Sequence, residues 1–462
     1  MTETPKALSG GFPARNETDW RALAEKALRG ADFDATLGRE TADRLMRGPA
    51  FFTRPDGAHA VDTRPKDEYL PWGMRQAIVE PDPQSANEAA LADLMGGVSE
   101  LQLNLDPEGR HGLKANEIDT LDAALKGIDL SLAPIHLETL RGQGHHADLL
   151  LTLFARRRLD GEGLRGGLGI NPIGRSARQG VALSPDCFDK AKALLELSQA
   201  AFPQLTIFRA DGALAFEAGA TEAQELAVMA GSVAAYMRLM GDAGLDANTA
   251  APLIELRLAA DTDIHVSIAK LRAARQVFAR IVSSFGADGP ALRANIQAVT
   301  AARMLSAKDP WTNLIRNACA GFAAASGGAD AITIRPLTDA LGRPSGFARR
   351  VARNLHTLLA EESHIGKVTD PAAGSYLHET LARNLAEKAW EIFQEIEARG
   401  GLAAAFADGS LQTAIAASRS AAMTRIAEGE AIILGVTKYP DPDPRAVQTR
   451  GSWGEEDWPE RR

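Results

Sequence analysis

The stretch Gly169–Ser176, GINPIGRS, carries the residue types of a loop that grips phosphate. A loop of the form GxxxxGK[ST] presents backbone N–H groups and a lysine at the start of a helix, where they meet phosphate oxygens. Here Arg175 replaces the lysine, and Pro185 interrupts the helix that this chemistry needs. We therefore expect no nucleotide binding and interpret the stretch as a short strand that ends in a turn at Pro172 and Gly174.

Histidines are the next candidates for acid–base or metal chemistry, and the sequence has nine. His145 and His146 are adjacent on a predicted helix and point about 100° apart, which is unsuited to shared chelation. His265 lies within a helical run, where a packed or surface role is more common than catalysis, and His364 is placed to cap the end of a helix. Because no HExxH or CxxC motif occurs, we predict no metal site.

The elements that would position such residues follow a regular pattern. From residue 70 onward, short β-branched or leucine-rich runs alternate with segments of helical periodicity. The predicted strands are 75–80, 100–104, 129–135, 167–171, 205–210, 254–259, 292–299 and 330–335. The helices that follow them begin near Ser85, Ala115, Gln143, Pro185, Thr221, Asp263, Trp311 and Ser345. This series predicts an α/β protein with a (β/α)8 TIM barrel; a doubly wound sheet is the alternative, but the unbroken repetition favours closure.

Chemistry in such a barrel is expected where the strands end. No predicted strand end brings paired carboxylates close to a histidine. Lys270 and Arg272 lie near each other on a predicted helix, and we interpret them as part of a solvated helix face. The sequence therefore predicts a barrel with sparse chemistry and no catalytic residue.

Other segments flank the barrel. An amphipathic helix, NETDWRALAEKALRG, precedes it, and three helical segments follow it. The end of the chain is rich in proline, charge and tryptophan, which is typical of a solvated tail or of an arm laid on a partner. The predicted organisation is an N-terminal helix and extended arm, the barrel, a C-terminal helical segment and a charged tail, at 1–69, 70–366, 367–437 and 438–462.

The net charge, the cysteine count and the lengths of the apolar runs exclude several classes of protein. The net charge is −9 and the basic residues are scattered, so no nucleic-acid partner is expected. Two cysteines at unrelated spacing predict no disulfide framework and a reducing compartment. The N-terminus lacks the apolar run of a signal peptide, and no stretch approaches the roughly 20 apolar residues of a membrane span. We expect a soluble, cytoplasmic protein.

The C-terminal third carries the most specific motifs. DPWTNLIRNACAGFAAASGGADAITI, FARRVARNLHTLLAEESHIGKVTDPAAGSY and LAEKAWEIFQEIEARGGLAAAF occur in that order, at 309–334, 347–376 and 385–406. Together with PWGMRQ at 71–76 and FEAGATEAQELA at 216–227, they resemble the methylmalonyl-CoA mutase family. The resemblance covers about residues 17–437 and is densest in the second half of the chain.

The resemblance implies a barrel that threads coenzyme A along its axis and is capped by adenosylcobalamin from a separate C-terminal flavodoxin-like domain. Active members carry a tyrosine at the end of Pro-Trp-x-x-Arg-Gln-Tyr and a histidine in Gly-Tyr-His-Met-Gln-Glu-Ala-Gly-Ala. This sequence has Ala77 at the tyrosine position and Leu214 at the histidine position. The strand that carries a substrate-binding arginine in active members aligns with GLGINPIGRSARQG, which has no clear counterpart for it.

The cobalamin features of the family are altered as well. The cobalt-ligand motif Asp-x-His-x-x-Gly has a near match at Asp263–Ile268, but it lacks the glycine and falls in a barrel helix. The family's Asp-Glu-Ala at the cofactor face reads Thr338-Asp339-Ala340. Only residues 431–462 follow the last predicted helix, which is too few for a flavodoxin-like domain. We expect no cobalamin-binding domain and no cofactor bound by this chain.

Two functional interpretations follow from the resemblance. In the first, the chain is the small, non-catalytic subunit of a heterodimeric mutase that interconverts methylmalonyl-CoA and succinyl-CoA, and adenosylcobalamin is held by the large subunit. In the second, it is the substrate-binding barrel of an acyl-CoA mutase that uses a separate cobalamin-binding protein. A CoA-binding regulatory remnant is a third interpretation. Arg75 and Arg272 match positions that contact coenzyme A in active members, although a salt bridge or a solvated charge would equally explain them.

Overall fold

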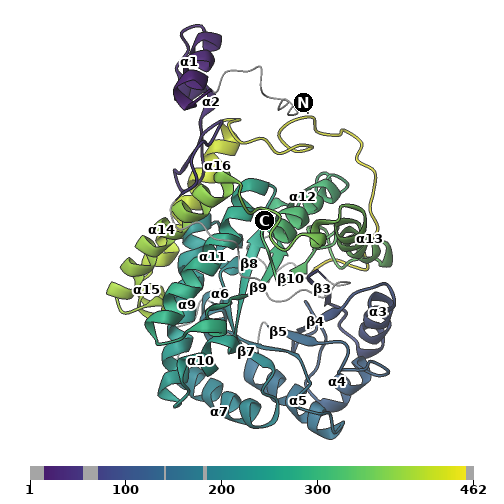
Figure 1. Cartoon of the computed structure of the whole chain (residues 1–462). Coiled ribbons are helices and arrows are strands. Elements are labelled where there is room, and N and C mark those ends of the chain that lie inside the picture. Colours follow the sequence, from purple (N-terminus) through teal and green to yellow (C-terminus); the bar gives the residue numbers. More distant parts are fainter. Residues whose placement is uncertain (1–14, 56–70, 140–141, 180–184, 454–462) are drawn as a thin grey trace, which may run out of the picture.

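The computed structural model describes residues 15–55, 71–139, 142–179 and 185–453, and its centre is a closed barrel (Figure 1). The eight barrel strands are parallel and pair in the order β10-β3-β4-β5-β6-β7-β8-β9. They are β3 (Gly73–Ile78), β4 (Glu100–Leu105), β5 (Ile135–Thr139), β6 (Gly166–Ile170), β7 (Leu205–Asp211), β8 (Ile254–Ala260), β9 (Asn295–Thr300) and β10 (Ala331–Thr333). The predicted TIM barrel is therefore confirmed.

Helices surround the strands, and each of the eight predicted helix starts lies within one turn of an observed one, while α6 and α8, which directly follow β6 and β7, were not predicted. They are α3 (Pro83–Met95), α4 (Ile118–Ala124), α5 (Gln143–Arg156), α6 (Pro172–Gln179), α7 (Pro185–Ala201), α8 (Ala213–Glu217), α9 (Glu222–Asp242), α10 (Ala247–Ala250), α11 (Ile264–Ser284), α12 (Asn313–Ser326) and α13 (Gly346–Thr357). Short turns of helix, η1 (Ala251–Leu253), η2 (Gly289–Leu292), η3 (Ala302–Met304), η4 (Leu358–Glu362) and η5 (Ile365–Lys367), complete the connections.

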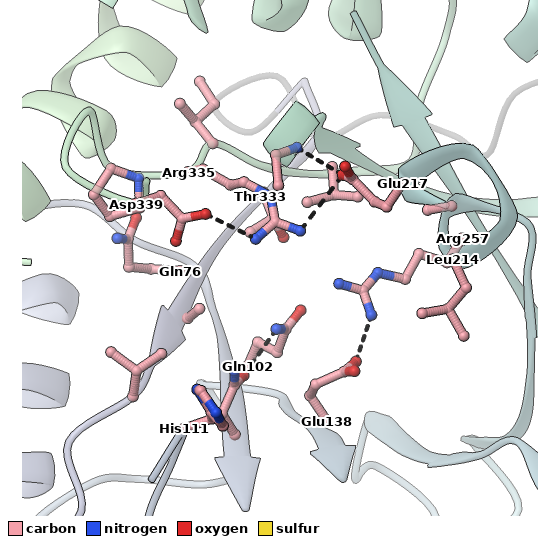
Figure 2. Close-up of a pocket in the computed structure, with 18 of the residues that line it drawn as sticks. Gln76, Gln102, His111, Glu138, Leu214, Glu217, Arg257, Thr333, Arg335 and Asp339 are labelled. Atoms are coloured by element: carbon pink, nitrogen blue, oxygen red, sulfur yellow. Dashed lines mark hydrogen bonds and ion pairs between the residues drawn. The ribbon is translucent and has the colours of Figure 1, made fainter. Parts of the chain in front are cut away.

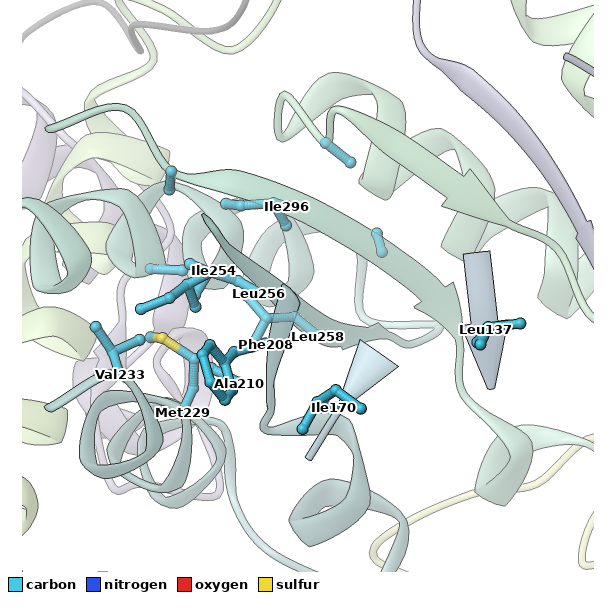
Figure 3. Packing of buried hydrophobic residues seen from close by; sticks show 14 of the residues in the cluster. Leu137, Ile170, Phe208, Ala210, Met229, Val233, Ile254, Leu256, Leu258 and Ile296 are labelled. Atoms are coloured by element: carbon cyan, nitrogen blue, oxygen red, sulfur yellow. The ribbon is translucent and has the colours of Figure 1, made fainter. Parts of the chain in front are cut away.

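The core lies between the outer face of the strands and the helices. Leu256 and Phe208 on neighbouring strands pack against Met229 and Val233 of α9, as Figure 3 shows. Each such side chain, fully buried, stabilises the fold by about 1.5–3 kcal/mol. Successive residues of a strand point to opposite faces, so the residues between these apolar ones point into the barrel.

The strand predicted at 129–135 is wrong, because β5 begins only at Ile135. The Asp129 carboxylate accepts hydrogen bonds from the backbone and hydroxyl of Ser131, and its carbonyl accepts from the amides of Leu132 and Ala133. These bonds fold the segment into a turn. The segment does contain the apolar residues on which the prediction rested, but the hydrogen bonds of Asp129 determine its local structure.

The turn predicted at Pro172 and Gly174 is also wrong, because α6 begins at Pro172 directly after β6. Proline is favoured at the first position of a helix, where its missing N–H costs nothing. The Asn171 side chain accepts a hydrogen bond from the Gly174 amide at 2.8 Å. A Cβ at Gly174 would lie 2.8 Å from Leu214 Cδ1, so glycine permits the close approach of α6 to α8.

The N-terminal segment stands partly clear of the barrel. Helix α1 (Glu17–Leu28) matches the predicted amphipathic helix, buries none of its residues and projects away from the barrel in Figure 1. After α2 (Phe33–Leu37), the hairpin of β1 (Arg39–Glu40) and β2 (Met46–Arg47) returns to the barrel. There Asp43 accepts from the Ala223 amide of α9, and Arg47 pairs with Asp263 at 2.9 Å.

Three helices follow the barrel, as predicted. They are α14 (Tyr376–Ala398), which packs along α9 and α11, α15 (Leu402–Ala407) and α16 (Ser410–Ala427). The segment after α16 then runs past α12 and α13, shown in yellow in Figure 1. Residues 445–453 thus lie on the chain's own barrel, and 454–462 fall outside the described residues. No helix in the described ranges combines the length and apolarity needed to cross a bilayer.

Candidate functional site

A pocket opens where the barrel strands end, at the face on which TIM barrels carry their active sites. It holds about 1020 Å³ of space, part of it open to solvent. Ala77 lines it from the end of β3 and Leu214, labelled in Figure 2, from α8. The two positions that the family resemblance matches to tyrosine and histidine therefore converge on one pocket. Neither a methyl group nor a leucine side chain can donate a proton or a hydrogen bond.

Ion pairs make up the polar walls of this pocket. Arg335 lies 3.3 Å from Asp339 and 3.8 Å from Glu217, and Figure 2 shows it between them. On the opposite wall, Arg257 lies 2.5 Å from Glu138. Asp339 is part of the altered Thr-Asp-Ala motif, so the structure places that motif at the same pocket.

Below the mouth, the axis of the barrel is occupied by longer charged side chains. Arg75 on β3 pairs with Glu255 on β8 at 2.7 Å, although these strands are not neighbours in the barrel. Arg209 on β7 bridges Glu255 at 3.1 Å and Glu138 on β5 at 2.6 Å. Contacts between non-adjacent strands of a closed barrel must pass through its interior. These side chains therefore fill the axis.

A layer of amides crosses the barrel in the same way. Gln297 on β9 donates to Gln102 on β4 and to Thr333 on β10, both at 2.9 Å. Gln102 in turn donates to Asn104 at 2.9 Å. The strands β4 and β9 are likewise not neighbours, so hydrogen bonds and ion pairs together tie opposite sides of the barrel.

Electrostatics keeps this interior in fixed protonation states. Burial alone would raise the pKa of Glu255, but the charges of Arg75 and Arg209 outweigh it and hold the pKa well below its ordinary range. Burial would likewise raise the pKa of Glu138, but the nearby arginine charges, that of Arg257 above all, outweigh it and lower this pKa to about 2. Burial, with the nearby charge of Arg75, lowers the pKa of His136 to about 4, so this imidazole is neutral at pH 7.

Arg75 and Arg272, the two candidate contacts for coenzyme A, are not brought together by the fold. Arg75 lies inside the barrel and is 2% exposed, whereas Arg272 lies on α11 and pairs with Asp370 at 2.6 Å. Neither residue lines the pocket at the mouth. Both are engaged in salt bridges, which is the alternative that the sequence left open.

The solvated face predicted for Lys270 and Arg272 is wrong. Lys270 is fully buried and pairs with Glu225 of α9, and Arg272 is buried as well. Helix α11 is covered by α9, α12 and α14, so its charged residues have neighbours on several sides. Long charged side chains are almost never fully buried unless they are paired, and these pairs satisfy that condition.

The four histidines considered in the sequence analysis, His145, His146, His265 and His364, lie outside the pocket at the mouth. His146 is fully buried, and burial lowers its pKa to about 4. His265 on α11 lies 3.0 Å from His378 on α14 through their ring nitrogens. His364 adopts a left-handed backbone conformation at φ 53° and precedes η5. Among the described residues, no group of three or more metal-ligating side chains is arranged to hold an ion.

Glu138, Arg209 and Arg257 were missed by the sequence analysis, although the signal was present. In IELRLA and LTIFRAD, charged residues alternate with apolar ones inside strands whose outer face is covered by helices. Strands of a parallel sheet that are buried on both faces normally read as nearly continuous apolar runs. A charge that recurs inside such a run can only point into the barrel, and this periodicity predicts the interior ion pairs.

Comparison with known proteins gives a consistent picture. The family model described as methylmalonyl-CoA mutase matches residues 48–452. The chain belongs to the methylmalonyl-CoA mutase family.

It is 36% identical to the methylmalonyl-CoA mutase small subunit of Streptomyces virginiae over 94% of this chain and 72% of the relative. The small subunit of Propionibacterium freudenreichii subsp. shermanii is 32% identical over 97% of this chain and 72% of the relative. A large subunit, from Porphyromonas gingivalis, is 36% identical over 49% of this chain and 32% of the relative.

The residues present do not fit the ligands that the family resemblance implies for active members. A coenzyme A chain along the barrel axis would meet the ion pairs of Arg75, Arg209 and Glu255, which cross that space. In the near match to the cobalt-ligand motif, His265 lies against His378 and is not among the residues that line the mouth. We therefore derive no reaction step through either group on this chain.

Proposed function

We propose that this chain is the small, non-catalytic subunit of a heterodimeric methylmalonyl-CoA mutase, and that it supports a large subunit that binds adenosylcobalamin. The main support is the convergence of Ala77 and Leu214 on one pocket, because the groups that assist catalysis in active relatives are replaced there by hydrocarbon. General acid assistance typically contributes about 10²–10⁴-fold to a rate, so its loss alone would disable the site.

The filled barrel axis supports the same proposal. Ion pairs that span a barrel rigidify it, and a rigid barrel suits a subunit whose task is to present a surface. The names of the relatives in Streptomyces and Propionibacterium, which are small subunits, point the same way. The proposed complex interconverts methylmalonyl-CoA and succinyl-CoA in propionate metabolism in the cytoplasm, with its chemistry in the large subunit.

Co-expression with the large mutase chain of the same organism tests the proposal. The two chains should elute as one species from size-exclusion chromatography, with a light-scattering mass equal to one copy of each. That species should turn over methylmalonyl-CoA when adenosylcobalamin is added. Separate elution of the two chains, with full activity in the large chain alone, would contradict the proposal.

The two other interpretations have less support in the structure. A substrate-binding barrel that borrows cobalamin needs hydrogen-bonding groups at positions 77 and 214, which hold Ala77 and Leu214. A CoA-binding remnant needs Arg75 and Arg272 to be available, and both already pair with buried carboxylates. Turnover when this chain is mixed with a separate small cobalamin-binding protein would favour the first of these alternatives.

A further inference from the structure

The C-terminal segment is fastened to the outside of the barrel before it reaches the mouth. The indole N–H of Trp311, which lies in the turn just before α12, donates to the carbonyl of Arg445 at 2.9 Å. Further along, the amide of Arg343 donates to the carbonyl of Gly451 at 2.9 Å, and the amide of Arg450 donates to the carbonyl of Arg343 at 2.8 Å. The segment therefore lies as a short antiparallel strap beside the chain that leads into α13.

The site that receives this strap is shaped for a close backbone approach. A Cβ at Gly342 would lie 2.2 Å from the carbonyl oxygen of Gly451, which no side chain could tolerate without displacement. Gly451 itself has φ +119°, a conformation that favours glycine. Glycines at both positions allow the two backbones to lie against each other.

The strap ends with an aromatic side chain in the pocket. Trp453 is one of the residues that line the mouth, and its indole N–H donates to the carbonyl of Asp339 at 2.8 Å. Its ring centroid lies 5.7 Å from that of His111, with the rings inclined by 30°. Asp339 and His111 come from different sides of the pocket in Figure 2, so the indole is held against both.

We propose that residues 449–453 form an intramolecular strap whose indole occupies part of the barrel mouth, so that a ligand reaches that part of the pocket only after the strap has been released. This inference concerns the chain by itself and does not depend on the proposed function. An apparent affinity scales with the fraction of molecules in the open state, so the strap lowers the affinity of any ligand that takes the indole space.

The chemistry of the pocket indicates which ligands the open state would take. Its cations Arg257 and Arg335 are each paired with carboxylates, so the walls offer little attraction for an anion. The side-chain oxygen of Gln76, a lining residue, is buried and has no hydrogen-bond partner among the described residues. A neutral aromatic compound with an N–H donor, which is the chemistry of the Trp453 side chain itself, suits this combination.

Fluoroindole, followed by fluorine NMR, is the probe for this proposal. Trp453→Ala should bind it saturably, because the variant leaves the indole space empty. The wild-type chain should bind it at least about tenfold more weakly. Trp20→Ala removes an indole from α1, where Trp20 packs on Phe33 and Phe52, and should behave like the wild type. Equal binding by wild type and Trp453→Ala, or no binding by either, would overturn the proposal.

Gly342→Val provides a second variant, which substitutes no residue that lines the pocket and keeps Trp453 in the chain. The valine side chain should displace the strap at a point that lies outside the pocket. Fluoroindole should then bind almost as tightly as it binds to Trp453→Ala, and the remaining difference reflects competition from the released Trp453. Hydrogen exchange in the wild-type chain is an independent readout. The amides of Arg343 and Arg450 should be protected, and exchange at the rate of unstructured peptide would contradict the strap.

Discussion

The axis and the mouth of this barrel differ in how their space is used. The axis is crossed by charged side chains such as Arg75 and Glu255, which pair between strands that are not neighbours. The mouth keeps a pocket of about 1020 Å³, part of it open to solvent, and Ala77 and Leu214 line it. One region is thus filled by paired charges, and the other keeps space that is lined in part by hydrocarbon.

The difference indicates which positions of the barrel tolerate substitution. A buried charge destabilises the fold unless it is paired. Loss of one arginine or glutamate from the axis therefore leaves its partners as buried charges with too few counter-charges. An uncharged residue at the mouth, such as Ala77, has no such constraint, because it faces the space of the pocket. We therefore expect substitutions in the axis to affect stability strongly and substitutions at the mouth to affect it little.

Removal of one axis charge should give the largest effect. Glu255→Gln leaves Arg75 and Arg209 buried with an incomplete set of partners and should lower the free energy of unfolding by about 3–5 kcal/mol. Urea unfolding measures this change. The control is Glu391→Gln, since Glu391 pairs with Lys388 on the exposed face of α14 and should cost below about 1 kcal/mol. Equal effects of the two variants would remove the distinction between axis and surface.

Lowering the pH should give the second-largest loss of stability. The pKa of His136 is about 4 in the folded chain, below its ordinary value, so the unfolded chain binds more protons between pH 6.5 and 4. Stability is therefore lost as the pH falls, and His136 alone should contribute a loss of about 2 kcal/mol between pH 7.5 and 5. The lowered pKa values of Glu138 and Glu255 add a further loss below about pH 4.5.

Urea unfolding at the two pH values checks this prediction. In His136→Gln, the difference between pH 7.5 and pH 5 should shrink by about 2 kcal/mol, whatever the absolute stability of the variant. Met95→Gln, a change at an exposed side chain that does not titrate, is the control and should leave the difference as it is. A pH dependence that is the same in His136→Gln and wild type would show that the imidazole is not held neutral.

A smaller effect is expected for a large residue at the mouth. Ala77→Tyr directs its ring into the pocket and should change the free energy of unfolding by less than about 1 kcal/mol. The matched variant Ala210→Tyr places the same side chain beneath α9, where Ala210 is fully buried, and should cost about 1–3 kcal/mol or more. If both changes cost the same, the mouth is packed as tightly as the core.

Restoring both lost groups at the mouth should have no effect on catalysis. Ala77→Tyr combined with Leu214→His replaces the groups that active relatives carry, but the axis stays filled by Arg75, Arg209 and Glu255. No turnover of methylmalonyl-CoA should appear when this double variant is assayed alone with adenosylcobalamin. Turnover by the double variant would show that the mouth, and not the axis, is what separates this chain from an active one.

The fold could be predicted from the sequence because apolar runs and helical periodicity repeat eight times, and each repeat has the same physical cause. The strand at 129–135 failed because Asp129 forms side-chain bonds that override an apolar run. The burial of Lys270 was missed because a helix covered on several sides has no solvated face, and that covering depends on tertiary packing.

The candidate site was predicted only in part, and for similar reasons. The motif alignment placed Ala77 and Leu214 at positions of interest, and the structure brings both to one pocket. The cross-barrel pairs of Glu138, Arg209 and Arg257 join residues far apart in sequence, so only barrel closure reveals their partners. Trp453 at the mouth was interpreted as part of a solvated tail or of an arm laid on a partner, because its contacts arise only when the chain returns to α13.

The most direct measurement is the mutase activity of the purified wild-type chain, assayed alone with adenosylcobalamin and methylmalonyl-CoA and again after addition of the large subunit. A chain with a filled axis and hydrocarbon at both catalytic positions should give no turnover alone, and activity should appear only with the large subunit. Measurable succinyl-CoA formation by the chain alone, above a control without protein, would contradict the account.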